Sequence, residues 1–307
     1  MSNQPCDNPC AQRPVDLPRA LDLLTSLHEG FAGVGAVVAI GPTAIEPLKA
    51  ILWRTETSGI FEVRGRAVMA LSALGADAAL IEFIEAQRRV EDPTARAGED
   101  ATISIAARAL KGSGHPRAFA VLLRLARRRP VLGAVEALAA SRRIEAIPAL
   151  IRGLDEDHTR AVAAAGLRSL GRASRGALLA IALAMDDCES ALRRRRVAMS
   201  LISEMGLAPW QWPDVRPLIE HADVELRLYA CLALLAAGDK VSAGGCRAQL
   251  ATLAPVLRAP LKELALGAIA AAQRPAQIAA PPDALPRSSR TRRPLLRLTL
   301  PPRATAR

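Results

Sequence analysis

The chain has 307 residues and a formal net charge of +11, and 50 % of its residues are hydrophobic while only 3 % are aromatic. Its five cysteines are odd in number and scattered, which argues against a disulfide framework. No apolar run reaches the roughly 18 residues needed to cross a bilayer, and no targeting segment is visible, so the sequence predicts a cytoplasmic protein without membrane contact.

The N-terminal residues 1–16 are rich in Pro, Asn and Gln and are predicted to be disordered. Cys6 and Cys10 lie in this segment without His or Cys partners nearby, so no metal site is predicted there. A first helix is expected from Leu17 to about His28, where it would cover the N-terminal end of the domain that follows.

The stretch 155–185 is a template for most of that domain. Ala163, Leu167 and Leu170 follow helical spacing, and Gly171 can end the helix because glycine adopts a left-handed conformation freely. A second helical face follows. One such helix pair cannot bury both faces alone, so it needs neighbours stacked against it. The residues of the second face are Leu178, Ile181, Ala182 and Met185.

Copies of this template recur with a similar register. Counting back from the turn, they share an Arg eleven residues before it, a small residue eight before it and an aliphatic residue four before it. The turns lie at Gly41, Gly75, Gly171, Gly206 and Gly238, with Ser141 and Gly112 as weaker matches; the Arg at Arg64, Arg160, Arg195 and Arg227; the small residues at Gly33, Ala67, Gly133, Ala163, Ala198 and Ala230; the aliphatic residues at Leu71, Leu167, Ile202 and Leu234.

Two stretches, Ala36–Leu52 and Glu145–Gly171, resemble the HEAT repeat, particularly the bacterial HEAT-like repeats first associated with phycobilisome lyases. The resemblance covers roughly residues 17–273 and implies an all-α fold, an α-solenoid (superhelix) of about seven HEAT-like helix pairs. The family includes scaffolds, adaptors and a few enzymes. The resemblance also implies a ladder between repeats, in which the recurrent Arg of each repeat pairs with an acidic residue. The acids are irregularly placed in this sequence, so a continuous ladder is not expected. They are Glu62, Asp157, Asp187 and Asp223.

Three features depart from the repeat pattern. The polar segment Arg88–Asp100 is predicted to be a mobile surface loop. The run Arg127–Arg129 is interpreted as a solvated helix end, with a phosphate site as the alternative. Gly244 and Gly245 are predicted to delay the start of the second helix of the last repeat.

Four prolines lie near the predicted starts of second helices, where the missing N–H costs little. They are Pro47, Pro148, Pro217 and Pro255.

Repeat six contains the candidate partner-binding residues. In the run 193–196, Arg195 occupies the recurrent position, whereas Arg193, Arg194 and Arg196 are predicted to be exposed. Trp210 and Trp212 follow in the turn, where three interpretations stay open: they fill a gap, they contact a protein, or they contact nucleic acid or another ligand.

The C-terminal segment 274–307 has eight Arg, seven Pro and one Asp, so it carries +7 of the net charge and is predicted to be a disordered basic tail. Such a tail would contact nucleic acid non-specifically. Its apolar stretch Leu295–Leu300 could dock on the domain or on a partner.

No catalytic motif, metal-binding spacing or cofactor site is found. The acidic pairs Asp155/Asp157 and Asp186/Asp187 are interpreted as helix caps. The leading hypothesis is a non-enzymatic protein–protein interaction scaffold or adaptor that uses the concave solenoid surface to bind an unknown protein. One alternative is a nucleic-acid-binding protein similar to the HEAT-like alkylation-repair glycosylases, with Trp210, Trp212, Asp214 and the Arg run as counterparts. A subunit of a lyase-type enzyme is the other.

Overall fold

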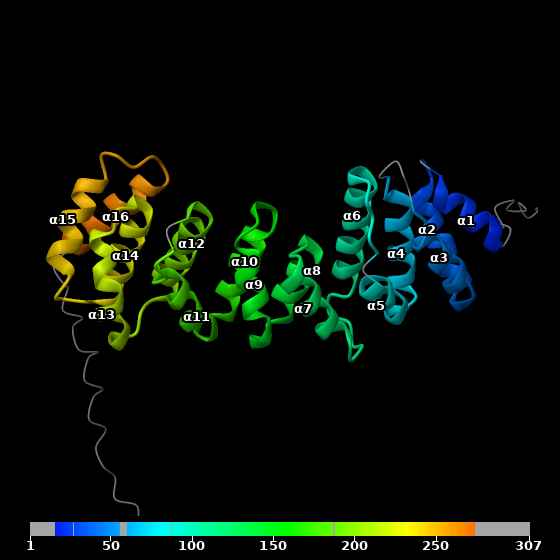
Figure 1. The fold of residues 1–307 in the computed structure, drawn as a ribbon, viewed down its shortest axis with the longest axis horizontal. Helices are drawn as coiled ribbons and strands as arrows, with labels where there is room; N and C mark the ends of the chain where they lie inside the picture. Colours follow the sequence, from blue (N-terminus) through cyan, green and yellow to red (C-terminus); the bar gives the residue numbers. More distant parts are fainter. Residues whose placement is uncertain (1–15, 27, 56–59, 87, 187, 274–307) are drawn as a thin grey trace, which may run out of the picture.

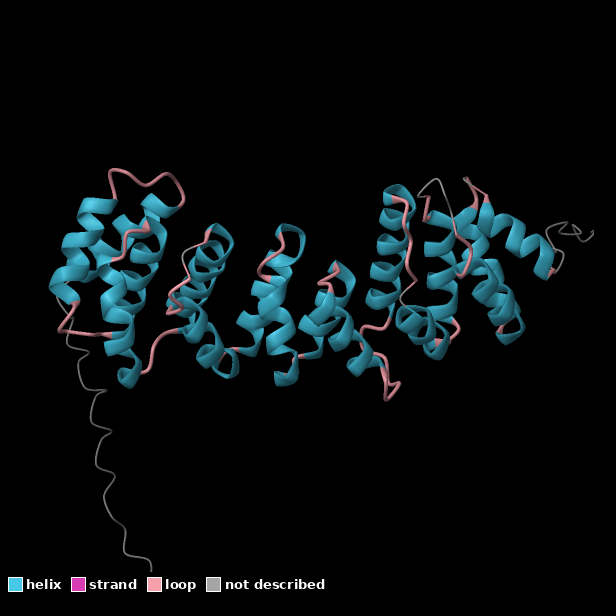
Figure 2. Cartoon of the chain, in the orientation of Figure 1, coloured by secondary structure: helices cyan, strands magenta, loops and turns pink. Residues whose placement is uncertain are grey.

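The computed structural model describes residues 16–26, 28–55, 60–86, 88–186 and 188–273. Within these ranges the chain forms sixteen α-helices and four short 3₁₀ helices, and no strand (Figure 2). The helices form one elongated array, with the N-terminal helices at one end and the C-terminal helices at the other (Figure 1). The fold is an all-α solenoid, as the sequence predicted.

Seven successive units follow the helix-pair pattern, with α1 (Leu17–Thr25) before them and α16 (Leu261–Gln273) after them. The first helices of successive pairs pack against one another from α2 to α14. Six pairs consist of two α-helices: α2 (Gly30–Ile40) with α3 (Ile45–Leu52), α4 (Glu62–Ala73) with α5 (Asp77–Ala86), α6 (Pro93–Ala109) with α7 (Ala118–Arg128), α8 (Leu132–Ser141) with α9 (Ile147–Gly153), α10 (Asp157–Leu170) with α11 (Arg172–Ala182), and α14 (Val224–Ala237) with α15 (Ala243–Leu253). In the other pair, α12 (Glu189–Met205) is followed by three short helices in place of one: η3 (Pro209–Gln211), α13 (Trp212–Val215) and η4 (Arg216–Glu220).

The turns inside the pairs fall where the sequence places them, with one shift. All six predicted glycines, from Gly41 to Gly238, have a positive φ. In the remaining pair the turn residue is Arg142, with a φ of +52°, rather than Ser141. Ser141 is the last residue of α8, where its hydroxyl donates to Leu138 O over 2.6 Å. The left-handed position is therefore one residue later than predicted.

The small residues of the repeat mark close approaches between first helices. A Cβ added to Gly133 would lie 1.8 Å from the carbonyl oxygen of Ser104 in α6. At Gly33 it would lie 2.3 Å from the backbone nitrogen of Leu24 in α1. The equivalent alanines Ala67, Ala163, Ala198 and Ala230 are fully buried, as are the aliphatic residues Leu71, Leu167, Ile202 and Leu234. The predicted register is confirmed.

The prediction of a loop over Arg88–Asp100 is wrong from Pro93 onward, because α6 begins there. Asp92 caps this helix, since its carboxylate accepts from the Ala95 N–H over 2.6 Å. Proline at the first helical position loses nothing there, since its missing N–H would have no partner inside the helix. The polar composition of this segment favoured a loop, although Asp92 and Pro93 are typical of a helix start.

The last pair differs from prediction in two places. Helix α15 begins at Ala243 and includes Gly244 and Gly245, so these glycines do not delay it. Pro255 follows the end of α15 instead of beginning a helix. Buried Leu250 and Leu253 account for this, because their packing can outweigh the roughly 1 kcal/mol that each helical glycine costs relative to alanine.

The predicted disordered segments, with the exception of Asp16, lie outside the described residues, and so do Cys6 and Cys10. Asp16 caps α1, because its side chain accepts from the Arg19 N–H over 3.1 Å. None of the described helices combines the length and the apolar character that crossing a membrane requires.

We expect Leu167→Asp to lower the free energy of unfolding by more than about 4 kcal/mol, because it places an unpaired charge at a fully buried position of α10. Ala165→Asp is the control, since it adds the same charge at an exposed position of that helix. Urea unfolding followed by circular dichroism measures both. Equal stability of the two variants would contradict the repeat register.

Two helical glycines allow an independent test of the close packing. We expect Gly133→Ala to destabilise by about 1–3 kcal/mol, because the new methyl group overlaps Ser104 O. Gly176→Ala in α11 meets no atom within 4 Å and should stabilise by about 0.5–1 kcal/mol. Thermal and urea unfolding of both variants measure the difference in sign. A stabilising Gly133→Ala would show that α6 and α8 do not approach this closely.

Candidate functional site at repeats five to seven

Three of the four recurrent arginines cap the preceding second helix, whereas Arg227 donates to Gln249 Oε1 over 3.5 Å. Arg195 is buried and its Nε donates to Ala182 O, at the end of α11, over 3.2 Å. Arg64 and Arg160 do the same for α3 and α9, donating to Leu52 O and Leu154 O over 2.9 Å each. A guanidinium at this place satisfies a carbonyl that lacks an intrahelical partner and lies at the negative end of the helix dipole.

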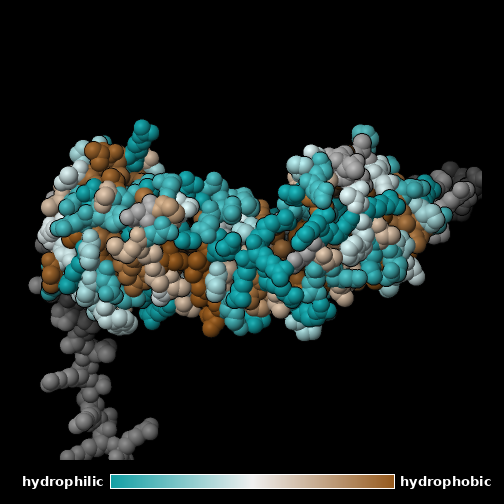
Figure 3. Space-filling view, viewed as in Figure 1, coloured by the Kyte–Doolittle hydropathy of each residue, from teal (hydrophilic) through white to brown (hydrophobic). Residues whose placement is uncertain are grey.

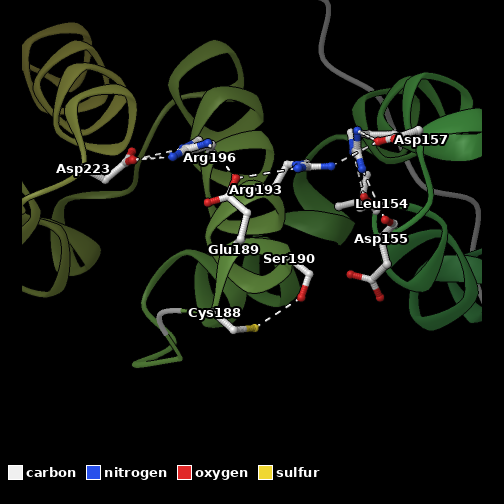
Figure 4. Close-up of polar contacts among 10 residues, drawn as sticks. Leu154, Asp155, Asp157, Cys188, Glu189, Ser190, Arg193, Arg196 and Asp223 are labelled. Carbon is white, nitrogen blue, oxygen red and sulfur yellow. Dashed lines mark hydrogen bonds and ion pairs between the residues drawn. The ribbon is translucent and has the colours of Figure 1, made fainter.

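The other three arginines of the run bind acids of the neighbouring repeats, and Figure 4 shows this for Arg193 and Arg196. Arg196 donates to Asp223 Oδ2 over 3.0 and 2.6 Å, and Arg194 donates to the Asp155 carboxylate over 2.9 and 3.2 Å. The side chain of Arg193 is 44 % exposed, but those of Arg194 and Arg196 are only 31 % and 25 % exposed. The predicted exposure is therefore wrong for Arg194 and Arg196, because acids on both sides of α12 draw them against the protein.

A continuous ladder of charges crosses three repeats. It runs from Asp157 to Arg193 (3.4 Å), to Glu189 (3.7 Å), to Arg196 (3.6 Å) and to Asp223 (2.6 Å), joining α10, α12 and the start of α14 (Figure 4). This ladder differs from the one that the repeat resemblance implies, because Arg193 and Arg196 of α12 build it, whereas the recurrent Arg195 caps a helix end.

The two aspartates at the ends of the ladder, Asp157 and Asp223, have lowered pKa values. Hydrogen bonding to Arg160, with a further contribution from Arg193, lowers the pKa of Asp157. Burial alone would raise the pKa of Asp223, but the bonds from Arg196 and from the Leu226 N–H outweigh burial and lower it. The same pairing raises the pKa of Arg196. Each arginine of the ladder thus faces a permanent counter-charge.

The acidic pair Asp155/Asp157 acts through ion pairs rather than as a helix cap. At the start of α10 the N-cap residue is Glu156, which makes no side-chain capping bond, while Asp155 and Asp157 bind arginines. The capping interpretation is therefore wrong for this pair. Asp186 does accept from the Cys188 N–H over 3.1 Å beside the start of α12, which lowers its pKa. Asp187 lies outside the described residues.

The two tryptophans have different environments. Trp212 is half-buried and packs against the hydrophobic core, which agrees with the interpretation that it fills a gap. Trp210 is 79 % exposed. The part of helix α12 between the Arg run and the helix end at Met205 separates this run from the tryptophans, a length of about 14–18 Å at 1.5 Å per residue. The structure does not bring the five candidate residues together into one surface.

The turn that carries Trp210 is held on both sides. Before it, the Ala208 N–H donates to Gln211 Oε1 over 3.0 Å. After it, Arg216 donates to both carboxylate oxygens of Asp239 over 2.9 Å each, which ties η4 to the next repeat. This bidentate pair lowers the pKa of Asp239 to about 2. Trp210 therefore projects from a fixed piece of backbone.

The described residues contain no group of three or more His, Cys, Asp and Glu placed to hold a metal ion. Two of the histidines have structural contacts: His158 Nε2 lies 3.2 Å from Pro130 O, and His221 Nε2 lies 3.3 Å from Arg195. Cys231 is buried, as predicted. The site consists of ion pairs and one exposed aromatic side chain.

Sequence reasoning missed a cavity between α5, α6 and α7. It is lined by Arg88, Arg89, Arg96, Arg128 and Arg129 together with apolar residues. In the sequence these arginines form two separate runs, one in the predicted loop and one at a helix end for which a phosphate site is the alternative. Their separation of about one repeat length could have indicated that they lie side by side.

No protein-family model matches the chain, and no curated protein matches it. Among solved structures, it is similar to a chain from the complex of CpcE and CpcF of phycocyanin lyase from Nostoc sp. PCC7120. The sequence identity is 19 %, the TM-score is 0.36, and the match covers 89 % of this chain and 99 % of that chain. At this TM-score the likeness carries no argument about function.

We expect Asp239→Asn to lower the free energy of unfolding at pH 7 by about 1–3 kcal/mol, because the side chain is 1 % exposed and accepts charge-assisted bonds from Arg216. The folded-state pKa of about 2 lies below the ordinary value of 3.8, so this stability is complete above about pH 4 and is lost as the pH falls toward 2. The difference in free energy of unfolding between wild type and Asp239→Asn should therefore shrink as the pH falls from about 4 toward 2.

Urea unfolding at pH 7, 4, 3 and 2.5 measures this difference. Asp214→Asn is the control, because Asp214 is an exposed aspartate of the same segment and its replacement should change little at any pH. A difference between wild type and Asp239→Asn that stays constant down to pH 2.5 would contradict the assignment to this ion pair.

Proposed function

We propose that the chain is a non-enzymatic scaffold or adaptor whose solenoid binds another protein, with Trp210 as an anchor of the interface. The observation that carries this proposal is the exposure of a large aromatic side chain on a fixed turn. Tryptophan is enriched among the residues that dominate protein interfaces, and a pre-organised backbone lowers the entropy lost on binding.

Trp210 follows the turn inside its pair by four residues. Two other large apolar side chains, Ile144 and Val241, are 63 % and 78 % exposed and also follow the turn inside their pairs. Because repeats stack in register, such residues lie along one edge of the array, which we call the turn edge. In the half of the molecule that contains α9 to α16, apolar residues reach the lower edge of the visible face (Figure 3). These positions favour the turn edge over the concave surface as the anchoring region.

The nucleic-acid alternative is less well supported by the described residues. An arginine must be free of other counter-charges to neutralise a phosphate of a nucleic acid. Arg193, Arg194 and Arg196 already face carboxylates of the protein. This alternative now depends on the basic segment 274–307, which lies outside the described residues. Nothing among the described contacts favours the lyase-subunit alternative.

The test is affinity capture from the native lysate with the tagged full-length chain, with and without nuclease, followed by mass spectrometry. Trp210→Ala is compared with Met185→Ala, which removes a side chain that is 90 % exposed but lies outside the turn edge, between α11 and α12. We expect a stoichiometric protein that survives nuclease and is retained by Met185→Ala. Trp210→Ala should recover it at least about tenfold less well, since loss of an interface anchor costs 2 kcal/mol or more.

Binding of that protein, once purified, is then titrated against the three forms of the chain. Equal affinity for wild type and Trp210→Ala would remove Trp210 as the anchor. Recovery that disappears entirely with nuclease would favour the nucleic-acid alternative, and a salt dependence lost on deleting residues 274–307 would assign it to the basic segment.

A further inference from the structure

We propose that the cavity between α5, α6 and α7 binds a small organic anion, namely a carboxylate or phosphate group attached to an apolar body. The cavity has a volume of about 410 Å³, within the range of small-molecule sites. It lies in repeats two and three, away from the ladder of α12 and from Trp210, so this proposal is independent of the scaffold role.

One wall of the cavity is a short strap, the segment Arg88–Asp92, which joins α5 to α6 and runs alongside α6 (Figure 2). Arg96 of α6 fastens the strap, because its Nε donates to Val90 O over 2.9 Å and its Nη2 to Glu91 O over 3.1 Å. At the other end, Arg88 Nη1 donates to Trp53 O over 2.9 Å. The wall is therefore formed before any ligand arrives.

The floor of the cavity is apolar. It consists of Ile84 from α5, Ile103 from α6 and Leu125 from α7, all of which are buried, with the half-buried Val90 of the strap beside them. Each of the three helices contributes one aliphatic side chain, so the floor depends on the packing of two repeats. An aliphatic or aromatic group of a ligand would be removed from water here, which is favourable in proportion to the apolar area covered.

The walls carry excess positive charge. The lining contains five arginines and three acids, a formal balance of +2; the arginines are Arg88, Arg89, Arg96, Arg128 and Arg129, and the acids are Glu91, Glu99 and Asp100. This balance matches a dianion, such as a phosphate monoester, or a carboxylate with one charge to spare.

Two of the three acids are already neutralised. Glu99 is paired with Arg64 over 2.6 Å, and Asp100 with Arg129 over 2.5 Å. In contrast, Arg96 donates to two backbone carbonyls and pairs with no carboxylate of the described residues. Arg89 is exposed beside it on the strap. Arg96 and Arg89 are thus the cations that an anionic ligand would meet.

The lining of the cavity accounts for both parts of the proposed ligand, the anionic head and the apolar body. A neutral apolar molecule would cover the floor but leave these two guanidinium groups without a counter-charge. An inorganic anion would meet the guanidinium groups but leave the floor in water. A molecule that combines an anionic head with an apolar body satisfies both, and charge-assisted bonds to arginine are among the strongest that a carboxylate or phosphate makes.

Titration calorimetry on the full-length protein tests this with four probes: octanoate, octyl phosphate, octanamide and inorganic phosphate. We expect the two octyl anions to bind with one-to-one stoichiometry, and each to bind at least about tenfold more tightly than octanamide and inorganic phosphate. The stronger of the two octyl anions identifies the preferred head group.

Two variants assign the binding to the cavity. Arg89→Gln removes a cation of the strap and should weaken the octyl anions roughly tenfold, while circular dichroism and the melting temperature stay unchanged. Arg127→Gln is the matched control, because Arg127 is an exposed arginine of α7 that does not line the cavity. Octanamide binding as tightly as octanoate, equal weakening by both variants, or no binding of either octyl anion at millimolar concentration would each overturn the proposal.

Discussion

The close approach of the first helices is the constraint on which the rest of this structure depends. Where α8 meets α6, the backbone of Gly133 lies so near Ser104 O that no side chain fits between them. The equivalent positions in other pairs hold buried alanines. This contact sets the spacing between repeats, and the spacing decides which side chains of one repeat can reach the next. The ion pairs and the cavity both follow from it.

The arginine content shows how this spacing is used. The chain has 41 Lys and Arg but only 30 Asp and Glu, a balance that suggests a surface for phosphates. Many of these arginines instead maintain the array. Arg64, Arg160 and Arg195 cap helix ends, while Arg193 and Arg196 reach the acids of adjacent repeats. Net charge is therefore a poor guide to function in this chain, and the informative positions are arginines that the fold leaves without a carboxylate.

The sequence predicted those parts of the fold that depend on local periodicity. The turn at Gly171, the small residue Ala163 and the aliphatic residue Leu167 lie about one to two helical turns apart, so the pattern alone identifies them. Ion-pair partners could not be predicted in the same way, because Arg194 meets Asp155 across a repeat boundary through the geometry of stacking. The start of α6 at Pro93 was missed for a different reason, since polar composition outweighed a capping signal that was present.

The two places with a proposed role are those where a repeat departs from the common pattern. Regular pairs bury their apolar faces against neighbours and neutralise their charges, so they leave little surface chemistry unused. Repeat three has a lengthened first helix, and the strap beside it encloses a cavity with unneutralised arginines. Repeat six replaces its second helix by short pieces, and Trp210 is exposed in the first of them. A regular solenoid supplies rigidity, and irregular repeats within it supply the binding sites. A substitution at either irregular site should therefore change binding without unfolding the array.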